Sequence, residues 1–192
     1  MSILPKKSYI SQEEYLTMER VSPVKHEYFD GEIFQMAGSS YEHAAISSNI
    51  NVSLGVQAKK GSCKTLQSDM RVFIPATGLY TYPDVVGVCG KPVLADDVHL
   101  DILLNPVLIV EVLSPSTEAY DKGAKFEHYR TIETLREYVL VWQDKKRVAR
   151  YTKREDESWV LTDFIGEDAS IELVSIGCAL TIEEIYDKVA IN

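Results

Sequence analysis

Two carboxylates lie at apolar segments that are typical of buried β-strands. Asp84 follows Pro83 at the start of the run VVGV, and Glu111 interrupts the run LIVEVL. A lone glutamate among branched apolar side chains is costly to bury without a cation or a hydrogen-bond donor. If the two strands are neighbours, the pair could hold Mg²⁺ (or Mn²⁺), because Mg²⁺ prefers few protein carboxylates, with water and phosphate oxygens completing its shell. Asp84 taken alone could equally be a turn residue.

A metal held by these two carboxylates would favour phosphoryl chemistry. Such an ion can generate a nucleophilic water, and a nearby lysine can orient that water or neutralise the phosphate. Lys122 and Lys125 follow in the segment EAYDKGAKFEHY. On a helix, Asp121, Lys125 and Tyr129 share one face. The alternative for Asp121 and Lys125 is an ordinary exposed ion pair worth about 0.3–0.5 kcal/mol, and the alternative for Tyr129 is packing.

A long helix is expected to begin at Ser39. Ser39 and Glu42 have the spacing of a capping box, and apolar residues recur every four positions from Ile46 to Leu54. The helix should end before Gly61.

The other expected elements are shorter and alternate between helix and strand patterns. A capped helix is expected at 11–20, and the Asp30-Gly31 turn predicts an N-terminal β-hairpin. Further helices are expected over 120–132 and 182–188. Strands are expected at 63–74 with a bend near Asp69, and at 84–89, 107–113, 137–142, 147–152 and 158–164. This order predicts one α/β (α+β) domain over residues 1–192, with a mixed central sheet flanked by helices.

Several phrases of the sequence form a recognisable combination. They are Tyr82-Pro83-Asp84, the phrase EVLSPST from Glu111 to Thr117, the D-x-x-x-K-x-x-x-Y row from Asp121 to Tyr129, the strand from Glu137 to Val141, the phrase FDGEI from Phe29 to Ile33, and His43. This combination resembles the PD-(D/E)XK phosphodiesterase superfamily, and more closely its Uma-type branch, over nearly the whole chain. The resemblance implies a restriction-endonuclease-like core with an N-terminal hairpin extension, a divalent metal at Asp84 and Glu111, and hydrolysis of phosphodiester bonds in nucleic acid.

One position departs from the superfamily pattern. Counting from Glu111, the lysine of the motif should stand at position 113, where this chain has Leu113. Residues 111 and 113 face the same side of a strand, so an apolar group occupies the usual place of the ammonium. The resemblance implies that the following helix supplies the lysine instead, and the family spacing favours Lys125 over Lys122.

Other polar residues could line the same cleft. In the first turn of the long helix, Glu42 could contact the metal or its water, and a neutral His43 could bind metal or phosphate. The capping box explains Glu42 without any site, and a buried, hydrogen-bonded histidine explains His43 equally well. Asp69 and Arg71 could line the cleft from an adjacent strand, or they could form a surface pair. The predicted hairpin adds two weaker candidates, Glu27 and Glu32.

The net charge of −9 opposes binding of nucleic acid through bulk electrostatics. Positive charge is concentrated at Lys59, Lys60 and Lys64, and in the stretch DKKRVARYTKR from Asp144 to Arg154. That stretch alternates as a half-exposed strand does, which favours an edge strand protected by charge over a phosphate-binding face.

The cysteines and the apolar runs bear on the compartment. Cys63, Cys89 and Cys178 are far apart and odd in number, so we expect free thiols and a reducing cytoplasm. No apolar run approaches the roughly 20 residues of a membrane span. The N-terminal residues MSILPKKSYI are too few and too polar for a signal peptide.

Two functions from different classes remain. The first is a Mg²⁺-dependent endonuclease in which Asp84 and Glu111 hold the metal and Lys125 (or Lys122) assists the attacking water. DNA is the expected substrate and a homodimer the expected assembly. The second is a nucleic-acid-binding or self-associating module on the same fold, with weak or no catalysis, which the acidic charge and Leu113 favour. The carboxylate inside an apolar strand favours the endonuclease, because an inactive module has no use for it.

Overall fold

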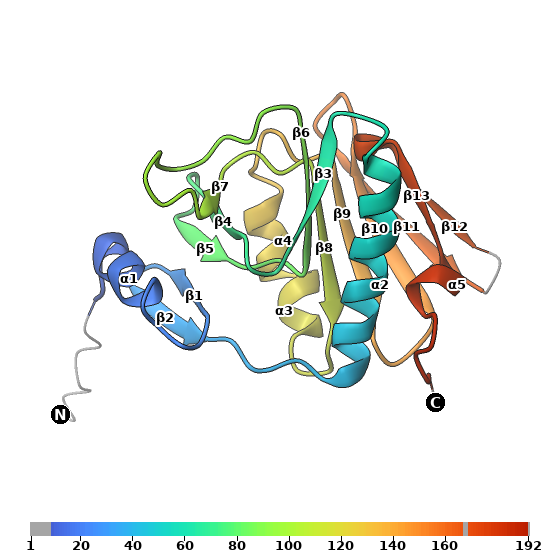
Figure 1. The fold of residues 1–192 in the computed structure, drawn as a ribbon, viewed down its shortest axis with the longest axis horizontal. Coiled ribbons are helices and arrows are strands. Elements are labelled where there is room, and N and C mark those ends of the chain that lie inside the picture. The colour runs from blue at the N-terminus through green and yellow to red at the C-terminus, as the bar shows by residue number, and fades with distance from the viewer. Residues whose placement is uncertain (1–8, 167–168, 192) are drawn as a thin grey trace.

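Six strands form a mixed sheet at the centre of the molecule (Figure 1). The computed structural model describes residues 9–166 and 169–191. In spatial order the strands are β11 (Trp159–Ile165), β10 (Arg147–Lys153), β9 (Glu137–Trp142), β8 (Leu108–Leu113), β6 (Val85–Cys89) and β3 (Cys63–Gln67). β8 and β9 are parallel, and the other neighbours are antiparallel. The prediction of a mixed central sheet is confirmed.

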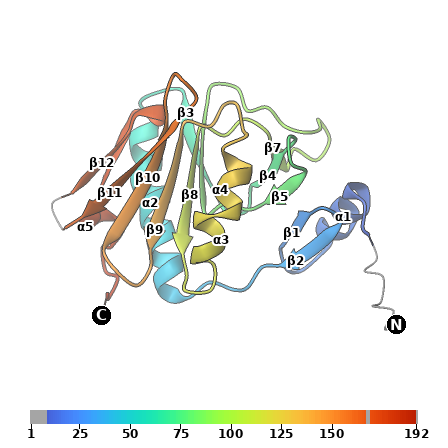
Figure 2. The same ribbon diagram turned by 180° about the vertical axis from the view of Figure 1, so that it is seen from behind.

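Helices cover both faces of this sheet. α2 (Tyr41–Ala58) lies on one face, and α3 (Glu118–Lys122) with α4 (Ala124–Tyr129) lies on the other (Figures 1 and 2). Side chains alternate between the faces along a strand, so Val110 of β8 shares a core with Ile46 of α2, whereas Ile109 shares a core with Phe126 of α4. Because α3 and α4 form the crossover between parallel strands, the carboxyl ends of β8 and β9 lie at one edge of the sheet.

A five-stranded sheet packs against the α3–α4 side of the central sheet. Its spatial order is β2 (Glu32–Gln35), β1 (His26–Phe29), β5 (Leu79–Thr81), β4 (Arg71–Ile74) and β7 (Ile102–Leu103). Val72 and Leu79 share a core with Tyr129 of α4. The hairpin expected as an N-terminal extension turns at Asp30 and Gly31 as predicted, but it is built into this second sheet through the pairing of β1 with β5.

The two ends of the described chain form smaller elements. α1 (Gln12–Glu19) begins after the predicted Ser11 cap. At the other end, β12 (Ser170–Leu173), the 3₁₀ turn η1 (Val174–Ile176), β13 (Cys178–Thr181) and α5 (Ile182–Ile185) pack on the α2 side of the central sheet. The predicted C-terminal helix therefore ends at Ile185 rather than at residue 188. No helix among the described residues is long and apolar enough to cross a membrane.

Two predicted elements are each divided in two. The expected strand over 63–74 is β3 and β4, which belong to different sheets, because the Met70 amide bonds to the Gln67 carbonyl and turns the chain between them. The expected helix over 120–132 is α3 and α4, which begin at Glu118 and separate at Gly123, whose φ of −114° and ψ of −98° are not helical. The bend expected near Asp69 is confirmed as the first break, whereas local periodicity does not reveal the second.

The start of α2 and the environment of β10 also differ from the prediction. Ser40, rather than Ser39, caps α2, and its hydroxyl accepts the His43 amide at 3.2 Å, so the capping box of Ser39 and Glu42 was wrong. β10 was expected at an edge, yet it pairs with both β9 and β11. Arg147 of β10 forms an ion pair with Asp163 of β11, so this charge is paired within the sheet.

The prediction of three free thiols was also wrong. Cys63 of β3 and Cys89 of β6 are direct cross-strand partners and form a disulfide, whereas Cys178 is a free, buried thiol. The sequence separation of 26 between the bonded cysteines gives no signal of pairing, because it is the antiparallel register of the two strands that brings them together. The inference of a reducing compartment from free thiols is therefore withdrawn.

Gly87 provides a test of the packing behind β6. A methyl group added there would meet Leu108 Cβ at 2.9 Å and Ile176 Cγ2 at 3.1 Å. We expect Gly87→Ala to lower the free energy of unfolding by about 1–3 kcal/mol through overpacking, measured by urea denaturation. Gly38→Ala is the control because nothing lies within 4 Å of its added methyl group. Equal stability of the two variants would contradict this packing.

Candidate active site

Asp84 and Glu111 come from neighbouring strands and share one face of the central sheet. β6 and β8 are antiparallel with Val85 opposite Val110, and one further step of this register places Asp84 opposite Glu111. Opposed residues of an antiparallel pair point to the same face. The Val112 amide donates a hydrogen bond of 2.7 Å to Asp84 Oδ2, which holds that carboxylate against β8. Both residues therefore lie on the face that α3 and α4 cover.

The ammonium of Lys125 lies among three carboxylates on this face. Lys125 Nζ is 3.0 Å from Glu111 Oε1, 3.1 Å from Glu27 Oε1 and 3.4 Å from Asp121 Oδ1. Lys125 is 5% exposed and Glu111 is 4% exposed, so water screens these charges little. The break at Gly123 leaves Asp121 and Lys125 paired across the two helices.

Tyr129 completes the environment of Glu111. Its hydroxyl donates a hydrogen bond of 2.7 Å to Glu111 Oε1, and the ring is buried against Tyr138. The interpretation of Tyr129 as a packing residue was therefore incomplete, because its hydroxyl also orients the carboxylate. Of the predicted row, Lys125 and Tyr129 contact Glu111 directly, and Asp121 contacts Lys125.

The site opens toward solvent on the side of Asp84 and His43. His43 Nε2 lies 3.3 Å from Asp84 Oδ2, and the two side chains are 18% and 15% exposed. Burial by itself would lower the pKa of His43, but the hydrogen bond and charge of Asp84 raise it above its usual value. His43 therefore tends to be positive beside the carboxylate that is nearer to water.

Burial governs the charge state of the inner residues. It raises the pKa of Glu111 and of Asp121, although the ammonium of Lys125 opposes both shifts. Burial would lower the pKa of Lys125, but the neighbouring carboxylates, led by Glu111, raise it well above its usual value. Lys125 is thus charged, and the carboxyl groups around it outnumber the cations. A divalent cation beside Glu111 would favour the charged form of its carboxyl group.

The oxygen donors suit a hard divalent cation. Asp84 and Glu111 each offer carboxylate oxygens on one face, and Mg²⁺ commonly uses one or two carboxylates with water and phosphate oxygens. Within residues 9–166 and 169–191, no three His, Cys, Asp or Glu side chains form a ready-made metal cage. The two carboxylates therefore fit an ion that takes most of its ligands from water and substrate.

Two candidates from the sequence lie away from this centre. Lys122 Nζ bonds to Glu118 on the surface, at 3.3 Å, so the structure brings Lys125 and not Lys122 to Glu111. Asp69 was expected as a cleft-lining residue, but its side chain is 88% exposed and pairs with Lys25. The turn between β3 and β4 directs Asp69 outward.

Glu42 lies in its predicted helical turn, whereas Arg71 does not pair with Asp69. Glu42 lies in the first turn of α2 and forms no ion pair within the described part of the chain. Arg71 was expected either to line the cleft or to pair with Asp69 on the surface. The surface pair was wrong, because Arg71 is 5% exposed and its Nε donates to the Tyr82 hydroxyl at 2.8 Å. The start of β4 thus contributes to a buried polar network beside the site.

Glu27 is the site residue that the sequence analysis ranked too low. Its position in the hairpin suggests only an exposed acidic residue, because the two-residue alternation of HEYF identifies its face but not what covers it. The signal available was that Glu27 must point away from Tyr28, which is buried. Only the packing of the two sheets shows that this opposite face meets Lys125.

Comparisons with known proteins agree with this fold. A family model named Uma2 and described as "Putative restriction endonuclease" matches residues 12–183. Two Synechocystis proteins, described as uncharacterized proteins slr1290 and sll1609, are 38% and 37% identical to this chain. The first match covers 94% of this chain and 93% of the relative, and the second covers 90% and 97%.

A solved structure resembles the whole fold. It is an Anabaena variabilis protein described as "a putative nuclease belonging to DUF820", with a TM-score of 0.78 and 18% identity. The match covers 94% of this chain and 99% of that chain. At this identity the likeness shows a shared fold, and it confirms the predicted restriction-endonuclease-like architecture.

Lys125 is expected to stabilise the fold as well as the site. Lys125→Met would leave three buried carboxylates without their cation, and we expect a loss of about 3–5 kcal/mol at pH 8. The ammonium holds down the pKa of Glu111 and Asp121, so these carboxyls protonate more readily in the variant, and the loss should shrink as the pH falls toward 5. Urea denaturation at both pH values measures this.

Lys122→Met is the matched control for that measurement. Its ion pair with Glu118 is partly exposed, so removal should cost about 1 kcal/mol or less. A similar loss for both lysines, or a Lys125→Met loss independent of pH, would contradict the buried cluster.

Proposed function

The chain belongs to the Uma2 family, and from this membership we propose that it is a divalent-metal-dependent endonuclease that hydrolyses phosphodiester bonds in nucleic acid. The family model spans residues 12–183. Restriction-endonuclease-like families generally use divalent metals. The finer parts of the proposal are DNA as substrate, Mg²⁺ (or Mn²⁺) as the ion, and a cytoplasmic homodimer of single-domain chains.

The convergence of Asp84, Glu111 and Lys125 carries this proposal. The two carboxylates lie opposite each other on β6 and β8, and the ammonium is 3.0 Å from one of them. Asp84 and Glu111 would hold the ion. A bound divalent ion would supply a nucleophilic water and stabilise negative charge on the phosphoryl group.

The remaining groups have roles set by their positions. The Lys125 ammonium, held beside Glu111, would orient the attacking water and offset charge that develops on the phosphate. Tyr129 fixes the Glu111 carboxylate, and the Val112 amide with His43 fixes that of Asp84. Because the Asp84 side is the more exposed one, the phosphate would approach from there.

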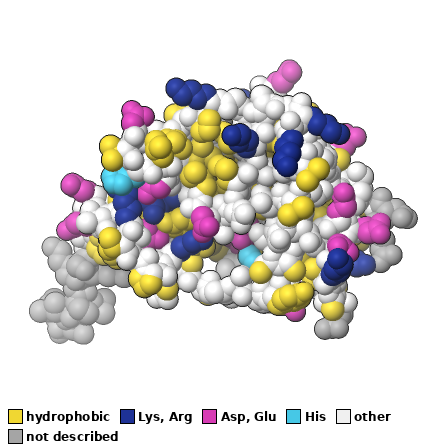
Figure 3. All heavy atoms as spheres, in the orientation of Figure 1, with side chains coloured by type: hydrophobic (Ala, Val, Ile, Leu, Met, Phe, Trp, Pro, Cys, Tyr) yellow, Lys and Arg dark blue, Asp and Glu magenta, His cyan; other side chains and the backbone are white. Residues whose placement is uncertain are grey.

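A module that binds nucleic acid without cleaving it is the second candidate. Leu113 occupies the usual position of the lysine, and the chain has a net charge of −9. Figure 3 shows Lys and Arg side chains separated from one another on the face in view, where they form no continuous basic surface among the described residues. The cleavage assay below separates the two candidates.

Cleavage of supercoiled plasmid with Mg²⁺ or Mn²⁺ tests the proposal. We expect Asp84→Asn and Glu111→Gln each to lower the rate by about 100-fold or more, since each removes an ion-holding charge. Calorimetry with Mn²⁺ should show the same variants losing affinity. The matched controls, Asp97→Asn and Glu183→Gln, alter exposed carboxylates and should cleave like the natural protein.

Two results would count against the endonuclease. One is cleavage that persists in both site variants, which would place the activity elsewhere or in a contaminant. The other is an absence of both metal binding and cleavage at millimolar Mn²⁺, which would favour the non-catalytic module.

A further inference from the structure

We propose that Glu27, from the N-terminal hairpin, is a positioning residue that holds the ammonium of Lys125 in place for phosphodiester hydrolysis. This inference rests on the proposed function and adds a residue from the second sheet to its site. Glu27 lies in β1, more than 80 positions before Glu111 in the chain, and it reaches Lys125 Nζ at 3.1 Å.

The register of the second sheet determines where Glu27 points. β1 and β5 are antiparallel with Tyr28 opposite Tyr80, so the next pair is Glu27 and Thr81. Tyr28 and Tyr80 pack with Tyr15 in a separate aromatic core. Side chains alternate along each strand, so Glu27 and Thr81 face the opposite way, toward α3 and α4.

Both oxygens of Glu27 are engaged there. The Thr81 hydroxyl and the Lys125 ammonium contact Oε1, and the Tyr120 hydroxyl donates to Oε2 at 3.3 Å. Glu27 is 9% exposed. The Tyr120 ring also lies beneath the ammonium, with Lys125 Nζ 5.6 Å from its centroid. A carboxylate held by donors from β5 and α3 is a rigid partner for the lysine.

Glu27 differs from the two other carboxylates that contact the ammonium. Asp121 lies on α3, four residues from Lys125, so it follows any shift of the α3–α4 segment. Glu111 is the proposed metal ligand, and a cation there would compete with the ammonium for its charge. Glu27 is the contact that ties Lys125 to the second sheet, independently of both.

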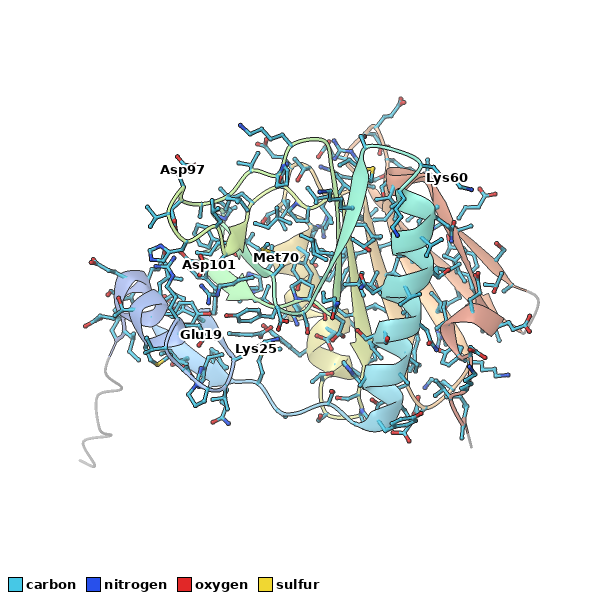
Figure 4. The ribbon with its side chains drawn as sticks, viewed as in Figure 1. Glu19, Lys25, Lys60, Met70, Asp97 and Asp101 are labelled. Atoms are coloured by element: carbon cyan, nitrogen blue, oxygen red, sulfur yellow. A yellow bond between two sulfur atoms is a disulfide. The ribbon has the colours of Figure 1, made fainter. Side chains whose placement is uncertain are left out.

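The hairpin that carries Glu27 is itself anchored beside the proposed metal site. Glu19 at the end of α1 accepts the His26 amide at 2.9 Å and the Tyr82 hydroxyl at 2.9 Å. Tyr82 lies two residues before Asp84 in the chain. Figure 4 shows Glu19 at the junction of the N-terminal elements with β4 and β5. One hydrogen-bond network, centred on Glu19, thus positions both the hairpin of Glu27 and the segment that leads to Asp84.

A double-mutant cycle on plasmid cleavage tests the inference. We expect Glu27→Gln to lower kcat by about 10–100-fold, with KM for DNA changed by less than about 3-fold, as for partners that orient a functional group. In a Lys125→Met background, Glu27→Gln should lower kcat no further, because it acts through the lysine. Glu13→Gln is the control, because Glu13 is an exposed residue of α1 in the same N-terminal segment, and this variant should keep the natural kcat.

Calorimetry with Mn²⁺ alone provides a readout besides activity. Glu27→Gln should bind Mn²⁺ within about 3-fold of the natural protein, because Glu27 does not hold the ion, whereas Glu111→Gln should lose affinity by about 10-fold or more. If Glu27→Gln does not fold, Thr81→Val replaces it, since this variant removes a hydroxyl donor to Glu27 and keeps the carboxylate.

Distinct outcomes overturn the inference and the proposed function. Equal losses from Glu27→Gln with and without Lys125 would assign Glu27 an independent role, and a loss of Mn²⁺ affinity matching Glu111→Gln would make it a ligand. Either result overturns the positioning role and leaves the endonuclease intact. If Asp84→Asn and Glu111→Gln both cleave plasmid as fast as the natural protein, the proposed function is overturned, and the inference with it.

Discussion

The burial of one ammonium among three carboxylates is the constraint on which this structure depends. Lys125 contacts Glu111 from the central sheet, Asp121 from α3 and Glu27 from the second sheet. Buried charges of this kind are costly unless they are paired and hydrogen-bonded. The two sheets and the helix pair between them therefore have to meet in one relative position, because any other arrangement would leave a buried carboxylate without its cation.

The same constraint links stability to chemistry. Tyr129, Thr81 and Tyr120 hold the carboxylates through hydroxyl groups, and these residues also pack the layers together. The carboxyl groups outnumber the cations in this cluster, and their burial is costly to the fold, but a divalent cation would favour their charged forms. The inner part of the site is closed by packing, and Asp84 with His43 forms its more accessible side.

Much of the site could be predicted because it depends on local patterns. Continuous apolar runs identified the strands of Asp84 and Glu111. The resemblance to the Uma-type branch favoured Lys125 over Lys122, and the four-residue spacing placed Asp121, Lys125 and Tyr129 on one helix face. Contacts between segments far apart in the chain were not predictable in this way. The disulfide between Cys63 and Cys89, and the outward turn of Asp69, depend on which strands become neighbours.

The sequence by itself determined the secondary-structure types, the carboxylates and lysine available for chemistry, and the face of each strand on which they lie. The tertiary structure alone decided that β1 pairs with β5, that Glu27 faces Thr81, and that this pair meets Lys125 beneath α3 and α4. The physical reason is that periodicity reports which side of a segment is buried, whereas the partner on that side is selected by many small packing contacts between distant segments.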